Sequence, residues 1–263
     1  MARADRTPDV PALSDGPGAT ELREIMGLRY WDVDLARAAR FLVDKARAGE
    51  RLQVYFVNAH CINVAARDSA YAQLLGSSPF LFADGAGMAL AARLAGMSLR
   101  HNVNGTDLFP KLCAAAAAAS IPVAFLGARR GVAAACAAQM EQQYPGLRVV
   151  WVADGYLDIA EEARRLQELQ GSGAKMLFVA KGVPVQEHWI AAQADRLAPP
   201  VVLGVGALFD FYSGTIARAP NFMRALRLEW LYRLLREPRR LFRRYVFGNP
   251  EFVARALLWR LHH

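Results

Sequence analysis

One carboxylate stands at the end of an apolar run in the segment Phe82–Gly87, directly before a glycine-rich turn. At such a place, Asp84 is suited to act as a general base or to bind the ribose of a nucleotide. An aspartate that caps the following helix fits the same residue pattern. The segment alone leaves both interpretations open.

Glycines at other turns point to phosphate binding. The turn Gly127–Gly131 contains Arg129 and Arg130 and precedes a helical pattern, so backbone amides and guanidinium groups meet there. An ordinary turn between strand and helix fits these residues as well. The segments Gly85–Gly87 and Gly204–Gly206 both lack the third glycine of the dinucleotide fingerprint. This argues against a nucleotide-sugar oxidoreductase, which is kept as the alternative enzyme class.

Other polar residues have weaker spacing signals. Asp32 and Asp34 resemble the DxD metal motif of sugar-nucleotide enzymes, but they precede an expected helix over Leu35–Ala48, which favours a helix start. His60 follows Asn58 by two residues and is a candidate site residue, although a core or surface histidine is the favoured interpretation. The histidines and the three cysteines do not have the spacing of a metal site. We therefore expect no metal and no cofactor.

A further candidate pair opens a helix after the run that ends at Lys181. Gln186 and Glu187 would project near a site at that strand end from the first turn of the helix. A glutamate is also common at helix starts for electrostatic reasons alone. The pair is therefore a candidate site with a structural alternative.

The elements that must position these residues are indicated by alternating apolar runs and helical patterns. Six runs are rich in Val, Leu and Phe without polar alternation, which is typical of parallel strands covered on both faces. They are Val54–Asn58, Phe80–Asp84, Val123–Gly127, Val149–Asp154, Met176–Lys181 and Val201–Gly206. Helical patterns separate them at Ile62–Leu75, Gly87–Ala95, Asp107–Ala119, Gly131–Gln143, Ile159–Leu169 and Gln186–Arg196. This order predicts a Rossmann-like α/β layered fold with its ligand site beyond the carboxyl ends of the strands.

The charge of the chain is concentrated at its carboxyl end. Residues 218–263 hold 11 arginines, no lysine and three acids, and so carry the whole net charge of +8. Within an expected helix over Leu228–Arg244, arginines share one face, and Pro238 either kinks that helix or starts a new one. The arginines of this face are Arg233, Arg236, Arg240 and Arg244. Aromatic residues such as Phe222, Trp230 and Tyr245 lie between them, which favours an anionic bilayer or a phosphate as the partner.

Two alternatives for this Arg-rich end stay open, a solvated helix face and a nucleic-acid-binding module. The neutral charge of the remaining chain argues against nucleic acid as the partner.

We predict a disordered segment over residues 1–20, an α/β catalytic domain over 21–217 and an Arg-rich appendage over 218–263. Apolar runs long enough to span a bilayer are not seen, the amino terminus does not read as a signal peptide, and the scattered cysteines favour the reducing cytoplasm.

Short motifs along the chain resemble, in order, those of the WecG/TagA/CpsF glycosyltransferases, family 26, over nearly all of residues 25–247. The pieces are Val57–Ala59, Ala83–Gly85, Gly105–Leu108, Phe125–Gly127, Tyr144–Leu147, Asp154–Tyr156, Pro184 with Gln186 and Glu187, Gly204–Gly206 with Phe209 and Asp210, Arg218–Pro220, Leu228–Arg233, and Glu237–Arg240 with Arg243–Tyr245. Each piece is weak alone. Eleven of them in order form a specific signature.

The resemblance implies an inverting, metal-independent hexosyltransferase with a GT-E type of fold. Such enzymes move a sugar from a UDP-sugar to a sugar linked by diphosphate to a polyprenol, at the inner face of the cell membrane. Asp84 is implied as the general base for the acceptor hydroxyl. The implied donor-binding residues are Asn58, Gly127, Tyr156, Gln186, Glu187 and Asp210. The implied residues for the acceptor diphosphate and the membrane surface are Arg233, Arg240 and Arg243.

Three residues depart from the family pattern around the implied donor pocket. Phe56 stands where members often carry a small hydroxyl residue, Asn102 where they often carry arginine, and Val185 where they often carry lysine. These departures favour glucose as the donor sugar, as in xanthan-type exopolysaccharide synthesis. The alternative donor is UDP-N-acetylmannosamine or its uronic acid form, as in teichoic acid or enterobacterial common antigen synthesis.

Overall fold

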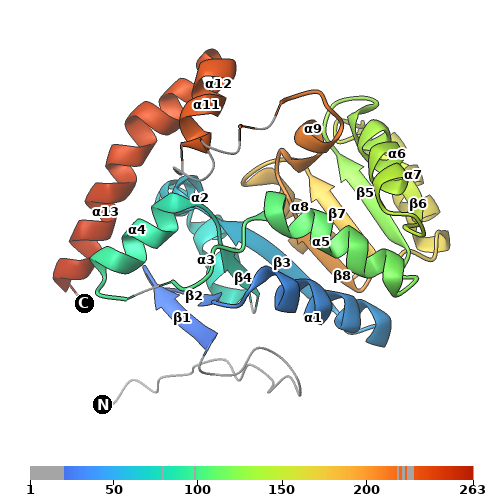
Figure 1. Cartoon of the computed structure of the whole chain (residues 1–263), viewed down its shortest axis with the longest axis horizontal. Helices are drawn as coiled ribbons and strands as arrows, with labels where there is room; N and C mark the ends of the chain where they lie inside the picture. The colour runs from blue at the N-terminus through green and yellow to red at the C-terminus, as the bar shows by residue number, and fades with distance from the viewer. Residues whose placement is uncertain are drawn as a thin grey trace.

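The computed structural model of the chain describes residues 21–78, 80–97, 99–217, 219–220, 223 and 228–262. The predicted disorder of residues 1–20 lies outside these ranges, as do Arg218 and Phe222. Within them, the chain forms a central sheet with helices on both sides and a layer of carboxyl-terminal helices at one end (Figure 1).

All six predicted strands are present and pair in parallel in one sheet. Their order across the sheet is β4-β3-β8-β7-β5-β6. The strands are β3 (Leu52–Val57), β4 (Leu81–Ala83), β5 (Val123–Gly127), β6 (Val149–Ala153), β7 (Met176–Ala180) and β8 (Val201–Gly204). The apolar runs identify them correctly because each strand is buried on both faces, so no polar alternation interrupts it. The predicted Rossmann-like α/β fold is confirmed.

Helices cover both faces of this sheet, and alternate strand residues face the two sides. In β3, Val54 and Phe56 belong to one apolar core, while Tyr55 and Val57 belong to the other. The first core contains α1 (Leu35–Ala48), α5 (Gly105–Ala118), α6 (Val132–Gln143) and α9 (Leu208–Tyr212). The second contains α2 (Ala59–Ala65), α3 (Ser69–Ser77), α4 (Ala86–Leu94), α7 (Ile159–Gly171) and α8 (Val185–Gln193). With both faces filled, the strand ends are left as the place for a ligand.

Two features differ from the expected elements. An antiparallel hairpin of β1 (Leu22–Ile25) and β2 (Leu28–Trp31) precedes α1. The helix expected over Ile62–Leu75 is divided into α2 and α3, because Oδ1 of Asp68 accepts the backbone N–H of Tyr71 (2.9 Å) and so starts a new helix.

The carboxyl-terminal layer consists of α11 (Glu229–Arg236), α12 (Pro238–Phe242), the π-helical turn η2 (Arg243–Phe247) and α13 (Gly248–His262). Pro238 starts a new helix, which is one of the two predicted outcomes. Helix α13 lies along α4 (Figure 1), and its Phe252 and Ala256 are each 2% exposed within the second core. In the described part of the chain, no helix has both the length and the apolar character needed to cross a membrane.

Candidate active site

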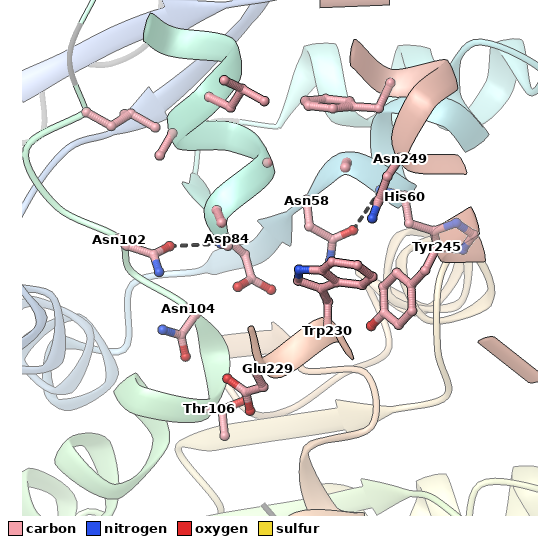
Figure 2. Close-up of a pocket in the computed structure, with 18 of the residues that line it drawn as sticks. Asn58, His60, Asp84, Asn102, Asn104, Thr106, Glu229, Trp230, Tyr245 and Asn249 are labelled. Atoms are coloured by element: carbon pink, nitrogen blue, oxygen red, sulfur yellow. Dashed lines mark hydrogen bonds between the residues drawn. The ribbon is translucent and has the colours of Figure 1, made fainter. Parts of the chain in front are cut away.

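A cavity of about 530 Å³ opens at the carboxyl ends of β3 and β4. Its walls come from the starts of α2 and α4, the connection between α4 and α5, and the carboxyl-terminal layer (Figure 2). Asn58 and Asp84 follow two neighbouring strands on one side, and Glu229 and Trp230 face them from α11 (Figure 2). Arg233 of the same helix also lines the cavity. Residues more than 140 positions apart in the sequence therefore meet in one cavity.

Backbone geometry holds the Asn58–Asp84 pair in place. The N–H of Asp84 donates to the carbonyl oxygen of Val57 (2.8 Å), which continues the pairing of β3 and β4 past the strand end. Oδ1 of Asn58 accepts the backbone N–H groups of His60 (3.0 Å) and Cys61 (3.3 Å) and so caps α2. The amide group of Asn58 thereby remains available to the Asp84 carboxylate, whose pKa it lowers.

The capping alternative for Asp84 is wrong. Helix α4 begins after Gly85, and no side chain bonds to its first backbone amides. Gly85 has φ +89°, a conformation that L-residues with a side chain rarely adopt, so glycine suits the turn that carries Asp84. The carboxylate is therefore free of a helix cap and faces the cavity (Figure 2).

The surroundings of Asp84 move its pKa towards neutrality. Removal of the carboxylate from water is the largest effect and raises the pKa of Asp84 to about 6. The amide of Asn58 and the guanidinium of Arg244 act in the opposite direction, while the carboxylate of Glu229 raises this pKa further. A carboxylate with a pKa near 6 is mostly ionised at pH 7 and still accepts a proton readily.

His60 contributes no positive charge to the cavity at neutral pH. Removal of its ring from water, followed by the charges of Arg244 and Arg67, lowers the pKa of His60 to about 4. His60 therefore lies in the cavity wall as a neutral, half-buried ring. The favoured interpretation, an ordinary core or surface histidine, does not describe it.

Two arginines of the carboxyl-terminal layer present unsatisfied donors. Arg233 and Arg244 both line the cavity, and their Nε atoms are buried. Among the described residues, neither Nε has a hydrogen-bond partner. The guanidinium of Arg233 lies over the ring of Phe211, 5.1 Å from its centroid, which fixes its orientation. Buried guanidinium donors of this kind suit a phosphate or diphosphate ligand.

The other two predicted arginines lie elsewhere. Arg243 is exposed, and Arg240 is exposed and pairs with Glu237 (2.6 Å). Neither lines the cavity, so their predicted contact with the acceptor stays a prediction. Arg244, which the cavity does include, is not among the implied acceptor residues, although the sequence analysis expects it on one helix face with Arg233.

A second group of predicted residues lies at the carboxyl ends of β5 to β8. A Cβ atom on Gly127 would sit 2.4 Å from the carbonyl oxygen of Ala180, so only glycine fits at the end of β5. Tyr156 follows β6 and is 79% exposed. Asp210 is half-buried, and its pKa is raised by removal from water, while the positive charges of Arg240 and Arg129 oppose the shift. None of these side chains lines the described cavity, so their donor-binding role stays a prediction.

Gln186 and Glu187 point into the protein, with exposed fractions of 2% and 1%. Oε1 of Gln186 accepts the backbone N–H groups of Gly206 (2.8 Å) and Gly182 (3.2 Å), and its amide donates to Glu187 (2.8 Å). Burial raises the pKa of Glu187 to about 7. The pair thus joins the loops that follow β7 and β8, and its direct contact with a donor stays a prediction.

In the acidic pair near the amino terminus, Asp34 behaves as the helix-start interpretation predicts. Its Oδ1 accepts the N–H groups of Ala36 and Arg37 (both 2.9 Å) and caps α1. Asp32 takes no part in the helix start, since it is buried and bonds to the connection between α4 and α5. The two carboxylates therefore have separate partners.

The three departures from the family pattern have different surroundings. Asn102 lines the cavity, and Phe56 is 7% exposed and stacks on Phe82 in the core, with ring centroids 5.8 Å apart. Val185 is 57% exposed at the start of α8. Of the three, only Asn102 is placed to touch a ligand in the described cavity.

The fold is an α/β protein with a parallel sheet and a cavity at the carboxyl edge of that sheet, the usual place for a ligand in this fold class. Comparison with known families narrows this class. The chain belongs to the glycosyl transferase WecG/TagA/CpsF family, which matches residues 23–263. The family predicted from the ordered motifs is thus confirmed, and the chain is a glycosyltransferase.

Several relatives carry the same name, N-acetylglucosaminyldiphosphoundecaprenol N-acetyl-beta-D-mannosaminyltransferase. The chain is 32% identical to that of Bacillus spizizenii (strain W23) over 193 residues, 73% of this chain and 74% of the relative. It is 31% identical to that of Bacillus subtilis (strain 168) over 201 residues, 76% and 77% of the two chains. The Staphylococcus aureus (strain MW2) relative is 29% identical over 192 residues, 73% and 75%. These names give no support to the predicted preference for glucose and exopolysaccharide synthesis.

Proposed function

We propose that the chain transfers N-acetylmannosamine from its UDP-sugar to a sugar linked by diphosphate to a polyprenol, with inversion and without a metal. The observation that carries this proposal is the meeting of Asp84 with Arg233 and Arg244 in one cavity. A base and a pair of diphosphate-binding groups are the two requirements of the acceptor half of the reaction. The relatives' names supply the donor sugar and the lipid-linked acceptor.

The proposed chemical step is a direct displacement at the anomeric carbon of the donor. The acceptor hydroxyl gives its proton to the Asp84 carboxylate, and its oxygen forms the new bond to the anomeric carbon. The bond from that carbon to the diphosphate oxygen breaks, and UDP leaves with the electron pair. Asn58, whose amide lowers the pKa of Asp84, is proposed to keep the base oriented.

The donor is proposed to bind along the strand ends next to this cavity. Gly127 ends β5 at a place where no side chain fits, and Tyr156 offers an exposed ring after β6. Asp210 lies at the start of α9 beside the carboxyl-terminal layer. In this arrangement Gln186 holds the loops after β7 and β8, Glu187 is its hydrogen-bond partner, and the pair stays a proposed part of the donor site.

A comparison of donors tests this function. With a short-chain polyprenyl diphosphate-N-acetylglucosamine as acceptor, we expect turnover of UDP-N-acetylmannosamine to exceed that of UDP-glucose by about 10²-fold, because a site that binds an acetamido group leaves polar groups unpaired with glucose. Mass spectrometry of the lipid product measures the transfer. UDP-N-acetylglucosamine, whose sugar differs from N-acetylmannosamine only in the configuration at one carbon, is the matched control. Because the proposed reaction needs no metal, an added chelator should leave the rate unchanged. Faster transfer from UDP-glucose would reinstate the donor predicted from the sequence.

We further propose that residues 218–263 act as an appendage that contacts the inner face of the cell membrane, and that residues 21–217 form the catalytic domain. Large apolar side chains of the described carboxyl-terminal helices are exposed beside the arginines. They include Leu235 (70%), Phe242 (50%), Phe247 (63%), Leu258 (56%) and Leu261 (79%). Exposed apolar residues mixed with arginine are typical of helices that lie in the surface of an anionic bilayer.

Flotation with vesicles of phosphatidylglycerol tests the membrane contact. We expect the Leu258→Glu/Leu261→Glu variant to bind these vesicles at least about 100-fold more weakly, because each leucine buried in the bilayer contributes about 1.5–3 kcal/mol. Ile159→Glu is the matched control, since Ile159 is 92% exposed but lies in α7, outside the carboxyl-terminal layer. Vesicle binding that is equal in the two variants, or a preference for DNA over vesicles, would contradict the proposal.

A further inference from the structure

One wall of the cavity is the connection between α4 and α5, which carries no regular secondary structure. Arg100, His101 and Asn102 all line the cavity from this connection, and their side chains are exposed. A loop lacks the regular backbone hydrogen bonds of a helix or strand, so other groups must bond to its backbone if it is to hold a defined position. The residues that fix its backbone therefore decide where these three side chains stand.

Asp32 supplies these partners from the end of the amino-terminal hairpin. Its Oδ2 accepts the backbone N–H of Arg100 (3.0 Å), and its Oδ1 accepts that of His101 (2.8 Å). The Asp32 residue is 5% exposed, and Nε of Arg23 lies 3.7 Å from its Oδ2. A buried carboxylate thus uses both of its oxygens on two consecutive amides of the cavity wall.

The same wall is joined to the turn that carries Asp84. Oδ1 of Asn102 accepts the backbone N–H of Gly85 (2.8 Å), the residue that directly follows Asp84 (Figure 2). Asn102 is adjacent in the chain to His101, whose amide Asp32 holds. A continuous path of hydrogen bonds and covalent bonds therefore runs from the Asp32 carboxylate to the Asp84 turn.

We propose that Asp32 is a positioning residue for sugar transfer, which sets the cavity wall at residues 100–102 and, through Asn102, the orientation of Asp84. This inference rests on the proposed function, in which Asp84 is the base. A carboxylate is required because two N–H donors face it. An asparagine offers one oxygen, and its amide group would oppose the second N–H donor. A misplacement on the order of 1 Å in an active site can lower the rate by about 10²-fold.

The test compares Asp32→Asn with Asp34→Ala, two changes in one segment that both remove acceptors of backbone N–H groups. We expect Asp32→Asn to lower kcat by about 10- to 100-fold with a smaller change in KM for the UDP-sugar. Asp34→Ala should lower the melting temperature through loss of the α1 cap and leave kcat unchanged. Equal kcat values for the two variants would overturn the inference.

A second variant keeps the inference testable if Asp32→Asn folds poorly. Asn102 is exposed, so Asn102→Ala should fold, and it removes the next contact on the path. We expect Asn102→Ala alone to lower kcat with a smaller change in KM for the UDP-sugar, and a wild-type kcat in this variant would overturn the inference. Where Asp32→Asn folds, the double variant Asp32→Asn/Asn102→Ala should lose no more kcat than the more impaired single variant, because both act on the same turn. Multiplicative losses would contradict a shared path. Asp84→Asn in the same assay separates the proposal for the base from the proposal for Asp32. If Asp84→Asn stays active, the assignment of Asp84 as the base fails. If Asp84→Asn is inactive while Asp32→Asn is fully active, only the role of Asp32 is overturned.

Discussion

Asp84→Asn is expected to lower the rate of sugar transfer by about 10²- to 10⁴-fold, the usual contribution of a general base. Asparagine has nearly the same shape and is neutral, so the buried position should tolerate it and the melting temperature should not fall. Donor binding, measured by titration with the UDP-sugar, should also persist, because the change removes only the proton acceptor. An active Asp84→Asn enzyme would show that another group deprotonates the acceptor.

The pH dependence of the wild-type enzyme gives a second sign of the same base. Burial raises the pKa of Asp84 to about 6. Only the ionised carboxylate accepts a proton, so kcat/KM should rise as pH increases through about 6 and level off above it. The pKa of His60 is about 4, so its titration falls well below this rise. A residual rate in Asp84→Asn that still rises near pH 6 would assign the inflection to a different group.

The sheet could be predicted from the sequence because its strands are buried on both faces and read as uninterrupted apolar runs. The hairpin β1–β2 could not, since each strand has four residues and Arg23 and Glu24 interrupt the apolar pattern of the first. The break between α2 and α3 was missed for a related reason. Apolar periodicity continues across Asp68, and only the direction of its side chain shows that it caps a new helix.

The part of the site that lies at the strand ends could be predicted from the sequence. Asn58 and Asp84 end adjacent parallel strands, so their proximity follows from the fold. The carboxyl-terminal residues are different, because Pro238 starts a new helix and the π-helical turn Arg243–Phe247 changes the helical phase. Sequence spacing therefore does not decide which neighbouring arginine enters the cavity. The burial of Gln186 likewise depends on side-chain direction at the start of α8.

Arg244→Ala is expected to lower kcat/KM for the lipid-linked acceptor by about 10- to 100-fold, because a charged hydrogen bond to a diphosphate contributes about 1.5–3 kcal/mol. The change should also act on the base. The positive charge of Arg244 lowers the pKa of Asp84, so its removal should move the midpoint of the pH profile above the wild-type value of about 6. Steady-state kinetics at several pH values measure both effects in one variant.

Arg243→Ala is the matched control, since it removes the same charge one position earlier from a side chain that is exposed and outside the cavity. We expect it to leave the pH midpoint unchanged and to alter kcat/KM much less than Arg244→Ala does. Arg244→Lys separates charge from geometry: lysine should keep the midpoint near 6, yet lose part of kcat/KM because it lacks the planar donor pair of arginine. Equal losses in Arg243→Ala and Arg244→Ala, with no change of midpoint in either, would place the acceptor diphosphate nearer to the exposed Arg240 and Arg243, two of the acceptor residues that the resemblance implied.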